Sequence, residues 1–332
     1  MLALALSIVF WTAVVVVLHT YAIYPLLLIL LDAVEQARST WRYIGGTERR
    51  RPAAQLGLPH VSVLVAAYNE ASCIGQRIEN LLAQDEKDAI RRLVQPLRDP
   101  AVGLVCGRLR LHSPLGAPVA EGAYWKLESM LKLYESRRGC VMGANGGIYA
   151  VRKHLFPPLP AGTVVDDFVA ALRVLQNGYE VQYEPEAVAH EETAPGHADE
   201  YKRRVRIAAG GFRALAQFRD LLSPRHGFTS FALWSHKVLR WFVPQAMVLA
   251  LAANALLAPH SRFYAALLFA QCGAYLLAAL GLLGLSPRKL GKLPDAAAHF
   301  VEMNAALLVG FWRFSRGQQG QTWTRTERAK AA

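Results

Sequence analysis

The apolar run at the amino terminus constrains the fold of this chain more than any other feature. From Leu2 to Leu31 the only ionisable side chains are those of His19, Tyr21 and Tyr24. A helix of about 20 apolar residues crosses the hydrocarbon core of a bilayer, so this run is long enough to span it with a tilt. A cleaved signal peptide would need a basic start and a shorter apolar core. We therefore expect an uncleaved transmembrane anchor over residues 1–35.

The carboxyl-terminal third, residues 229–332, returns to the membrane. Aromatic and basic residues around Trp234 and Arg240 resemble an interfacial belt, and they precede an apolar run that ends near Leu257. A second apolar run covers residues 262–285. We expect two spans here, followed by an interfacial or re-entrant helix over residues 296–314, which contains polar side chains.

Basic residues next to the apolar segments predict the orientation. Arginines follow the anchor at Arg38, Arg42, Arg49, Arg50 and Arg51. An excess of Lys and Arg marks the cytoplasmic side of a membrane protein. We therefore expect a multi-pass protein of the cell membrane whose central domain, residues 36–228, is cytoplasmic.

The net charge of +12 favours anionic partners, which include lipid headgroups and polyanionic small substrates. Nucleic acid is not expected, because the excess charge lies beside the apolar segments and the sequence contains no nucleic-acid-binding motif. The four cysteines have no metal-ligand spacing, and a cytoplasmic domain keeps thiols reduced.

The central domain begins with a stretch, residues 59–70, that has the pattern of a buried strand ending in a polar tip. Residues 61–67 are apolar, and Tyr68, Asn69 and Glu70 follow them. An α/β domain often opens a nucleotide site at the carboxyl end of such a strand. The tip is equally consistent with a turn in which Asn69 caps the next helix.

Further along, helical and extended patterns alternate, which predicts an α/β domain. Helices are expected at residues 71–84, 88–97, 120–137, 167–177 and 200–218, and strands at 102–109, 148–152 and 179–183. The glycine-rich residues 143–147 predict a turn, and Gly178 is placed to end the helix before it.

Two motifs in this domain have side chains suited to catalysis. Asp166 and Asp167 lie at a predicted helix start, where a carboxylate is either a plain cap or a general base. Arg203 and Arg206 share a helix face three residues apart. They either clamp a diphosphate or form a solvated or lipid-facing surface.

Taken in order, these motifs resemble the membrane-bound family 2 glycosyltransferases, which include the cellulose, hyaluronan and poly-N-acetylglucosamine synthases. The resemblance rests on residues 61–70, 143–149, 165–168, 203–211, 235–241 and 317–328. It implies a GT-A-like fold and inverting transfer of a hexosyl or N-acetylhexosaminyl group. The donor would be a nucleotide-sugar, such as a UDP-sugar, and the acceptor a glycan or lipid-linked hydroxyl in polysaccharide or glycoconjugate synthesis.

The resemblance also assigns roles to individual residues. Asp167 matches the catalytic base, with Asp166 next to it, and Arg203 and Arg206 match a motif near the donor diphosphate. The acceptor-side loop is matched by Gly143, Ala144, Asn145 and Gly146. The nucleotide side is matched by Tyr68, Asn69 and Glu70.

The sequence departs from the family pattern in three places. Arg203 and Ile207 occupy the Gln and Trp positions of the Gln-x-x-Arg-Trp motif, which argues against processive polymerisation. Asp166 replaces a common Glu. The third departure is that residues 71–85 run directly into residues 87–92, which implies an internal truncation near residues 85–86.

The truncated portion would carry an Asp-Gly-Ser strand end and an Asp-x-Asp strand end. Mg²⁺ or Mn²⁺ is expected from the family, but its usual Asp-x-Asp ligands are not found in the sequence. Two alternatives to an active enzyme therefore stand: a catalytically impaired or non-enzymatic membrane remnant or partner subunit, and an incomplete record of a longer enzyme.

Overall fold

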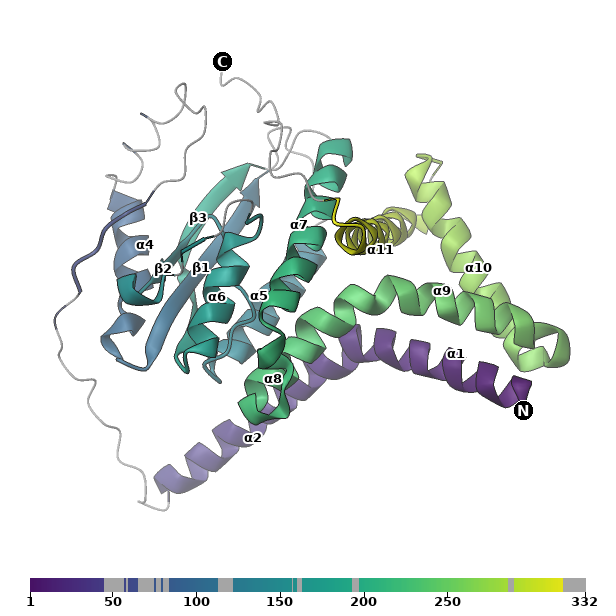
Figure 1. The fold of residues 1–332 in the computed structure, drawn as a ribbon, viewed down its shortest axis with the longest axis horizontal. Helices are drawn as coiled ribbons and strands as arrows, with labels where there is room; N and C mark the ends of the chain where they lie inside the picture. The colour runs from purple at the N-terminus through teal and green to yellow at the C-terminus, as the bar shows by residue number, and fades with distance from the viewer. Residues whose placement is uncertain are drawn as a thin grey trace.

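The computed structural model describes residues 1–44, 57, 59–64, 75, 79, 84–112, 122–156, 158–159, 163–192, 197–285 and 290–318. An α/β domain lies beside a set of long helices drawn from both ends of the chain (Figure 1).

Three strands form the described sheet, in the order β2-β1-β3. The central strand β1 (Val102–His112) is antiparallel to β2 (Tyr149–Val151) and parallel to β3 (Glu180–Glu192). Successive β1 residues, Leu104, Val105 and Cys106, are all fully buried. This pattern fits a strand covered on both faces, and it explains the nearly continuous apolar sequence of β1.

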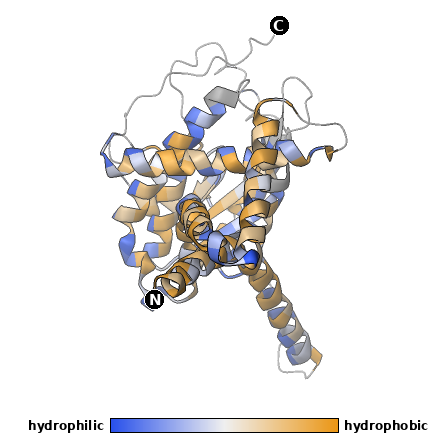
Figure 2. Ribbon diagram, turned by 90° about the vertical axis from the view of Figure 1, so that its right-hand side faces the viewer, coloured by the Kyte–Doolittle hydropathy of each residue, from blue (hydrophilic) through white to orange (hydrophobic). Residues whose placement is uncertain are grey.

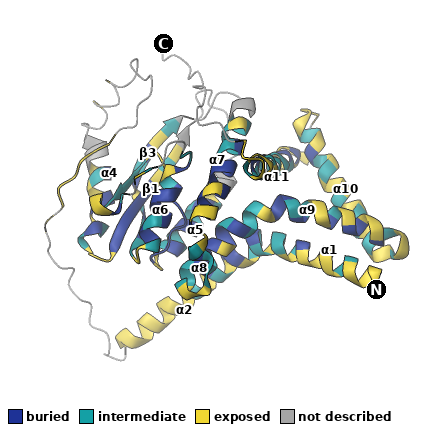
Figure 3. Cartoon of the chain, viewed as in Figure 1, coloured by how far each residue is buried: buried dark blue, intermediate teal, exposed yellow. Residues whose placement is uncertain are grey.

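Helices cover both faces of the sheet (Figure 1). Val105 packs with Leu93 and Val94 of α4 (Gln84–Val94) on one face, whereas Leu104 packs with α6 (Asp166–Gln176) on the other. Two more helices complete the domain: α5 (Gly122–Ser136) and α7 (His197–Gln217). The buried core therefore lies mainly between the sheet and α6, most of whose residues are buried (Figure 3).

The end of α6 confirms the predicted glycine stop. Gly178 has a positive φ of 79°, its N–H donates to Leu175 O, and the Tyr179 N–H donates to Val174 O. This pair of bonds satisfies the last carbonyls of the helix in the Schellman arrangement. The turn sends the chain directly into β3.

β3 is longer than the sequence pattern predicts. The expected strand ends at Tyr183, but β3 continues to Glu192. Its pairing with β1 shifts register between Gly107 and Arg108, where the partners change from Glu184 to Val188. A bulge of this kind accommodates the intervening Pro185, so the strand continues beyond the predicted end.

The expected first strand is wrong for the part of it that the structure describes. Residues 61–64 form no strand, and Val63 and Leu64 are 53% and 83% exposed. A strand needs a hydrogen-bonded neighbour, and these residues pair with none of the three described strands. Residues 65–70, including the Tyr68–Glu70 tip, lie outside the described residues.

Within the described residues, three helical segments are long and apolar enough to cross a membrane: residues Leu2–Ile44, Phe228–His260 and Arg262–Leu282. The first contains α1 (Leu2–Leu18), a π-helical turn η1 (His19–Ile23) and α2 (Tyr24–Ile44). The second contains α8 (Phe228–Ala232), a π-helical turn η6 (Leu233–Val238) and α9 (Leu239–Leu257). The third is α10.

Many residues of these segments are both hydrophobic (Figure 2) and exposed (Figure 3). Phe269 of α10, for example, is 83% exposed. Where α1 meets α9, Phe10 and Ala13 pack against small side chains such as Ala246 and Ala250. Small residues allow apolar helices to approach closely, so this contact has the composition of a membrane helix pair.

The last described helix, α11 (Leu293–Ser315), packs against α7 and α10 (Figure 1). A Cβ on Gly310 would lie 2.4 Å from the Cβ of Ala208 in α7. Short 3-10 turns connect the remaining elements: η2 (Pro96–Arg98), η3 (Lys153–Leu155), η4 (Arg219–Leu222), η5 (Pro224–His226) and η7 (Ala258–His260).

Candidate functional site

The start of α6 and the glycine-rich loop 143–147 face each other. Asp166 and Asp167 form the first turn of α6, as the sequence predicts. A Cβ built on Gly146 would lie 3.4 Å from Oδ2 of Asp167. The loop and the carboxylate therefore form one site, although 20 residues of sequence separate them.

Asp167 differs from Asp166 in its surroundings. Burial raises the pKa of Asp167, and the neighbouring Asp166 carboxylate raises it further. The Phe168 N–H, which donates to Oδ1 at 2.8 Å, and the ammonium of Lys132 lower the pKa without fully offsetting the increase. Asp166 is exposed. Asp167 is thus the carboxylate that is better adapted to accept a proton.

The loop 143–147 is attached to β1 through Asn145. The Asn145 N–H donates to Cys106 Sγ at 3.1 Å, and its Nδ2 donates to Gly107 O at 2.6 Å. Gly143 has a φ of 113°, and a Cβ there would lie 3.2 Å from the Phe168 ring. Ala144 is buried beside them. These contacts hold Gly146 against Asp167.

Lys132 of α5 is a site residue that the sequence patterns did not indicate. It is 4% exposed, its Nζ donates to Asn145 Oδ1, and it lies 3.9 Å from Cys106 Sγ. Burial lowers its pKa, but Cys106, Glu128 and Asp167 together raise the pKa above its ordinary value. The site therefore contains a buried positive charge.

Glu128, Lys132 and Glu135 lie on one face of α5, at spacings of four and three residues. Both glutamates are buried and contact His236 of η6: Glu128 Oε2 lies 3.2 Å from Nε2 and Glu135 Oε1 lies 2.7 Å from Nδ1. Their spacing is the signal that could have found this face. It was missed because charges along a helix usually mark a solvated side.

Each glutamate has further partners. Glu135 accepts from the Tyr24 hydroxyl at 2.8 Å and from the Met142 N–H at 3.1 Å. Lys237 Nζ and Arg240 Nη1 donate to Glu128 at 3.3 and 3.0 Å. Burial raises the pKa of Glu128, but these cations and His236 hold the pKa well below its ordinary value. α5 is thereby joined to two of the long apolar segments.

The two π-helical turns, η1 and η6, also meet beside this cluster. His19 Nε2 lies 3.0 Å from Ser235 Oγ, across 216 residues of sequence. π turns are rare and often lie at functional sites. Here η6 places His236 against α5, and η1 places His19 against η6.

Arg203 and Arg206 lie on α7, as predicted. Arg203 Nε donates to Glu200 Oε2 at 2.8 Å, and Arg206 is half-buried, with its pKa lowered by burial and by the charge of Arg203. Further along α7, a Cβ on Gly211 would lie 2.7 Å from the Trp241 ring.

Trp241 also connects this helix to α6. Its ring makes an edge contact with Phe168, the residue after Asp167, at a centroid distance of 5.7 Å. Phe212 of α7 contacts the same ring at 5.2 Å. The arginine-bearing helix and the residue after Asp167 thus both pack against one aromatic side chain.

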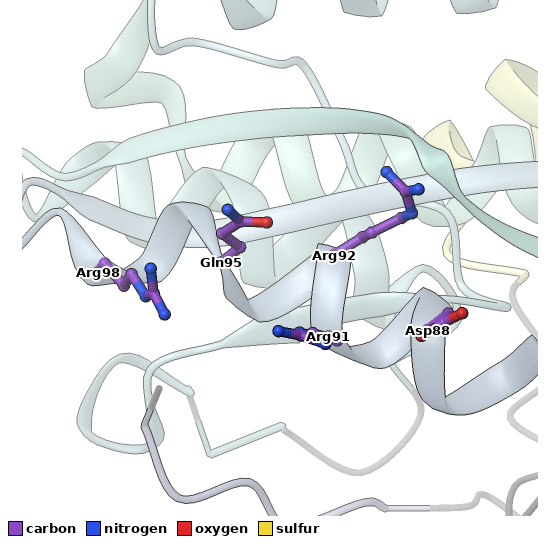
Figure 4. A pocket seen from close by; sticks show the side chains of 5 residues that line it. All are labelled: Asp88, Arg91, Arg92, Gln95 and Arg98. Atoms are coloured by element: carbon purple, nitrogen blue, oxygen red, sulfur yellow. The ribbon is translucent and has the colours of Figure 1, made fainter. Parts of the chain in front are cut away.

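The described part of the chain contains neither the expected metal site nor the residues expected to contact the nucleoside. Among those residues, no three His, Cys, Asp or Glu side chains gather to hold a metal ion. Asp88 lines a polar pocket of about 340 Å³ with three arginines and Gln95 (Figure 4), and such a basic lining does not fit a cation. Tyr68, Asn69 and Glu70 lie outside the described residues.

Comparison with known proteins gives the following similarities. A mannosyltransferase from Pyrobaculum calidifontis, PcManGT, solved in complex with GDP-Man and Mn²⁺, is 22% identical, with a TM-score of 0.49. The similarity covers 70% of this chain and 59% of that one, so the chain spans less than two thirds of PcManGT. No curated protein matches.

The sequence also matches a family profile described as glycosyl transferase family group 2 over residues 88–280, more than half of the 332 residues. The expected fold class, an incomplete GT-A-like α/β domain flanked by helices apolar enough to span a membrane, is confirmed. The chain belongs to the glycosyl transferase family group 2.

Proposed function

We propose that the chain transfers a hexosyl or N-acetylhexosaminyl group from a nucleotide-sugar, such as a UDP-sugar, to a hydroxyl of a glycan or lipid-linked acceptor. Transfer inverts the anomeric centre and serves polysaccharide or glycoconjugate synthesis. The observation that carries this proposal is the position of Asp167, whose Oδ2 faces Gly146 of the loop 143–147. Family membership supports the reaction class.

In this proposal Asp167 is the general base. Its carboxylate takes the proton of the acceptor hydroxyl while the hydroxyl oxygen forms a bond to the anomeric carbon of the donor. The bond from that carbon to the diphosphate oxygen breaks, and the nucleoside diphosphate leaves with the electron pair. Asp166 lies next to this base in the first turn of α6. The acceptor side is lined by Gly143, Ala144, Asn145 and Gly146.

The donor side of the proposal rests on the resemblance. Arg203 and Arg206 would contact the diphosphate, whose charge matches their positive face, and Tyr68, Asn69 and Glu70 would contact the nucleoside. Mg²⁺ or Mn²⁺ belongs to the proposal as a family expectation. The described residues offer no fitting ligand set, so no step is assigned to the ion.

The membrane arrangement completes the proposal. We infer that residues 1–35 form an anchor, that residues 229–332 contribute two spans and an interfacial or re-entrant helix, and that the domain 36–228 lies in the cytoplasm. Three sufficiently long apolar helices support a membrane location. The arginines after the anchor support the orientation.

A second candidate function is a non-enzymatic or catalytically impaired membrane subunit that retains only the acceptor side. Two observations favour it: residues 61–64 lie outside the sheet, and the described residues contain no metal-binding cluster. This alternative predicts no saturable binding of nucleotide-sugars even when Mn²⁺ is present.

The test uses the full chain purified into lipid nanodiscs. UDP- and GDP-sugars are supplied with Mn²⁺ and membrane extract as the acceptor source, and nucleoside diphosphate release and labelled product are measured. Donor-dependent transfer that is lost in Asp167→Asn supports the proposal. Absence of both transfer and calorimetric donor binding would support the non-enzymatic alternative instead. Transfer that survives Asp167→Asn would remove Asp167 from the mechanism.

A further inference from the structure

Lys132 occupies a position where a lysine side chain needs a specific reason. Its side chain is buried at 4% exposure, and removing an ammonium group from water is costly unless the charge is paired and hydrogen-bonded. The proposed reaction assigns it no role. It lies beside the loop and the carboxylate that the reaction uses.

The first contact of Lys132 fixes Asn145. Lys132 Nζ donates to Asn145 Oδ1, while Asn145 Nδ2 donates to Gly107 O at 2.6 Å and the Asn145 N–H donates to Cys106 Sγ. With both ends of its amide bonded, Asn145 has one side-chain orientation. The Ile148 N–H then donates to Asn145 O at 3.0 Å, which closes the turn that contains Gly146.

The second contribution of Lys132 is its charge. The ammonium lowers the pKa of Asp167 against the opposing effects of burial and Asp166. The charged or titratable groups that act on Asp167 or on Lys132 are Asp166, Lys237, Glu128, Cys106, Tyr149 and Tyr183. Among these groups, Lys237 is a second cation, besides Lys132, that lowers the pKa of Asp167.

The position of Lys132 is itself fixed by the residues before and after it on α5. Glu128 and Glu135, on the same face, bind His236 at 3.2 and 2.7 Å. Glu135 also accepts the Met142 N–H, next to the start of the loop. The ammonium is therefore anchored through α5 to the segment Phe228–His260.

We propose that Lys132 is a positioning residue of the glycosyl-transfer site: it fixes Asn145, keeps the loop 143–147 against Asp167, and places its ammonium group beside that loop. The inference deepens the proposed function and rests on it for the role of Asp167. The placement of the loop by Lys132 is a claim about the fold, and it can be tested without activity.

The first measurement is backbone hydrogen exchange by mass spectrometry on the full chain in nanodiscs. Lys132→Met keeps the length of the side chain and removes the charge, and Asn145→Ala removes its partner. The control is Lys126→Met, because Lys126 is an exposed lysine of the same helix. Exchange in residues 143–148 should rise about tenfold in both test variants, since a hydrogen bond to a charged group contributes on that order to an equilibrium.

The double variant should exchange no faster than Asn145→Ala alone, because that variant has already lost the contact with Lys132. The control variant should exchange like the wild type. The proposal is overturned if Lys132→Met leaves exchange in residues 143–148 unchanged. It is also overturned if exchange rises equally in α6 and β3, which would show general destabilisation.

The second measurement is the pH profile of kcat/KM. In Lys132→Met the acid limb should move to higher pH, because Asp167 loses a stabilising cation, whereas Asn145→Ala should leave the position of that limb unchanged. If the acid limb of kcat/KM stays at the wild-type pH in Lys132→Met, the claim that the Lys132 charge acts on Asp167 is overturned. If the wild type transfers no sugar from any donor, the proposed function fails, and the exchange measurement still decides whether Lys132 positions the loop.

Discussion

His236 Nδ1 lies 2.7 Å from Oε1 of Glu135, and neither side chain is more than 1% exposed. The contact joins η6, within one of the three apolar segments, to α5 of the α/β domain. Because Glu135 also accepts the Met142 N–H, the same carboxylate connects this segment to the start of the loop 143–147. The α/β domain and the apolar helices are thus coupled through buried polar contacts.

We expect Glu128→Gln to destabilise the fold at neutral pH by about 3–5 kcal/mol, because it removes the carboxylate from a buried cluster of cations. The folded-state pKa of Glu128 lies well below the ordinary value. Its contribution is therefore fully present above the unfolded pKa and is lost as pH falls through the folded pKa. Thermal unfolding of both proteins across a pH series measures this.

The matched control is Glu35→Gln. Glu35 is 58% exposed and pairs with Arg42 on the surface of α2, so its loss should change stability by less than about 1 kcal/mol. Equal effects of the two substitutions would show that the cluster around Glu128 is not a special source of stability.

Asp167→Asn should lower kcat by about 10²- to 10⁴-fold, the usual contribution of a general base. Asp166→Asn should retain most of the activity, because the Asp166 side chain is exposed. The rate of nucleoside diphosphate release at saturating donor and acceptor measures kcat of both variants. The assignment would be wrong if the larger loss occurred at Asp166.

Activity should fall on the acid side at a pH above about 3.9, the ordinary pKa of an aspartate. The reason is that burial, and then Asp166, raise the pKa of Asp167, and a base works only when it is ionised. In Asp166→Asn the acid limb of kcat/KM should move to lower pH, because a repelling charge is removed. A limb that moves upward, or stays fixed, contradicts this assignment.

Gly310→Ala should destabilise the packing of α11 on α7 by about 1–3 kcal/mol. The added Cβ would lie 2.4 Å from Ala208 Cβ and 3.0 Å from Ala209 N, so the helices must move apart. Gly273→Ala in α10 is the control, since its Cβ would meet nothing within 4 Å. We expect the control to unfold at the wild-type temperature or slightly above it, because Ala favours a helix.

Much of the α/β domain could be predicted from local sequence. β1, the helix beginning at Asp166 and the glycine stop at Gly178 each depend on short-range rules that the chain obeys. The turn at residues 143–147 is of the same kind. The family resemblance then related Asp167 to the loop, a relation that spacing alone does not contain.

What could not be predicted depends on partners far away in sequence. The apolar residues 61–64 have the composition of a strand, but a strand also needs a neighbour to pair with, and these residues pair with none of the three described strands. The sequence pattern of Glu128 and Glu135 is that of a solvated helix face, but His236 of η6 contacts both side chains in the fold. Their burial depends on an element about 100 residues away.

The paired π turns at His19–Ile23 and Leu233–Val238 have a consequence for how this chain can change over evolution. A π turn adds one residue to a helix and advances everything beyond it by about 100°. η1 and η6 lie side by side and are joined by the His19–Ser235 contact. The two helices therefore rotate at neighbouring positions along their axes. Deleting one residue from either turn would rotate Tyr24 or the Trp241 ring out of phase with α5 and α6. Either change would break the contacts that these side chains make with α5 and α6, which predicts that each of these two segments keeps its length.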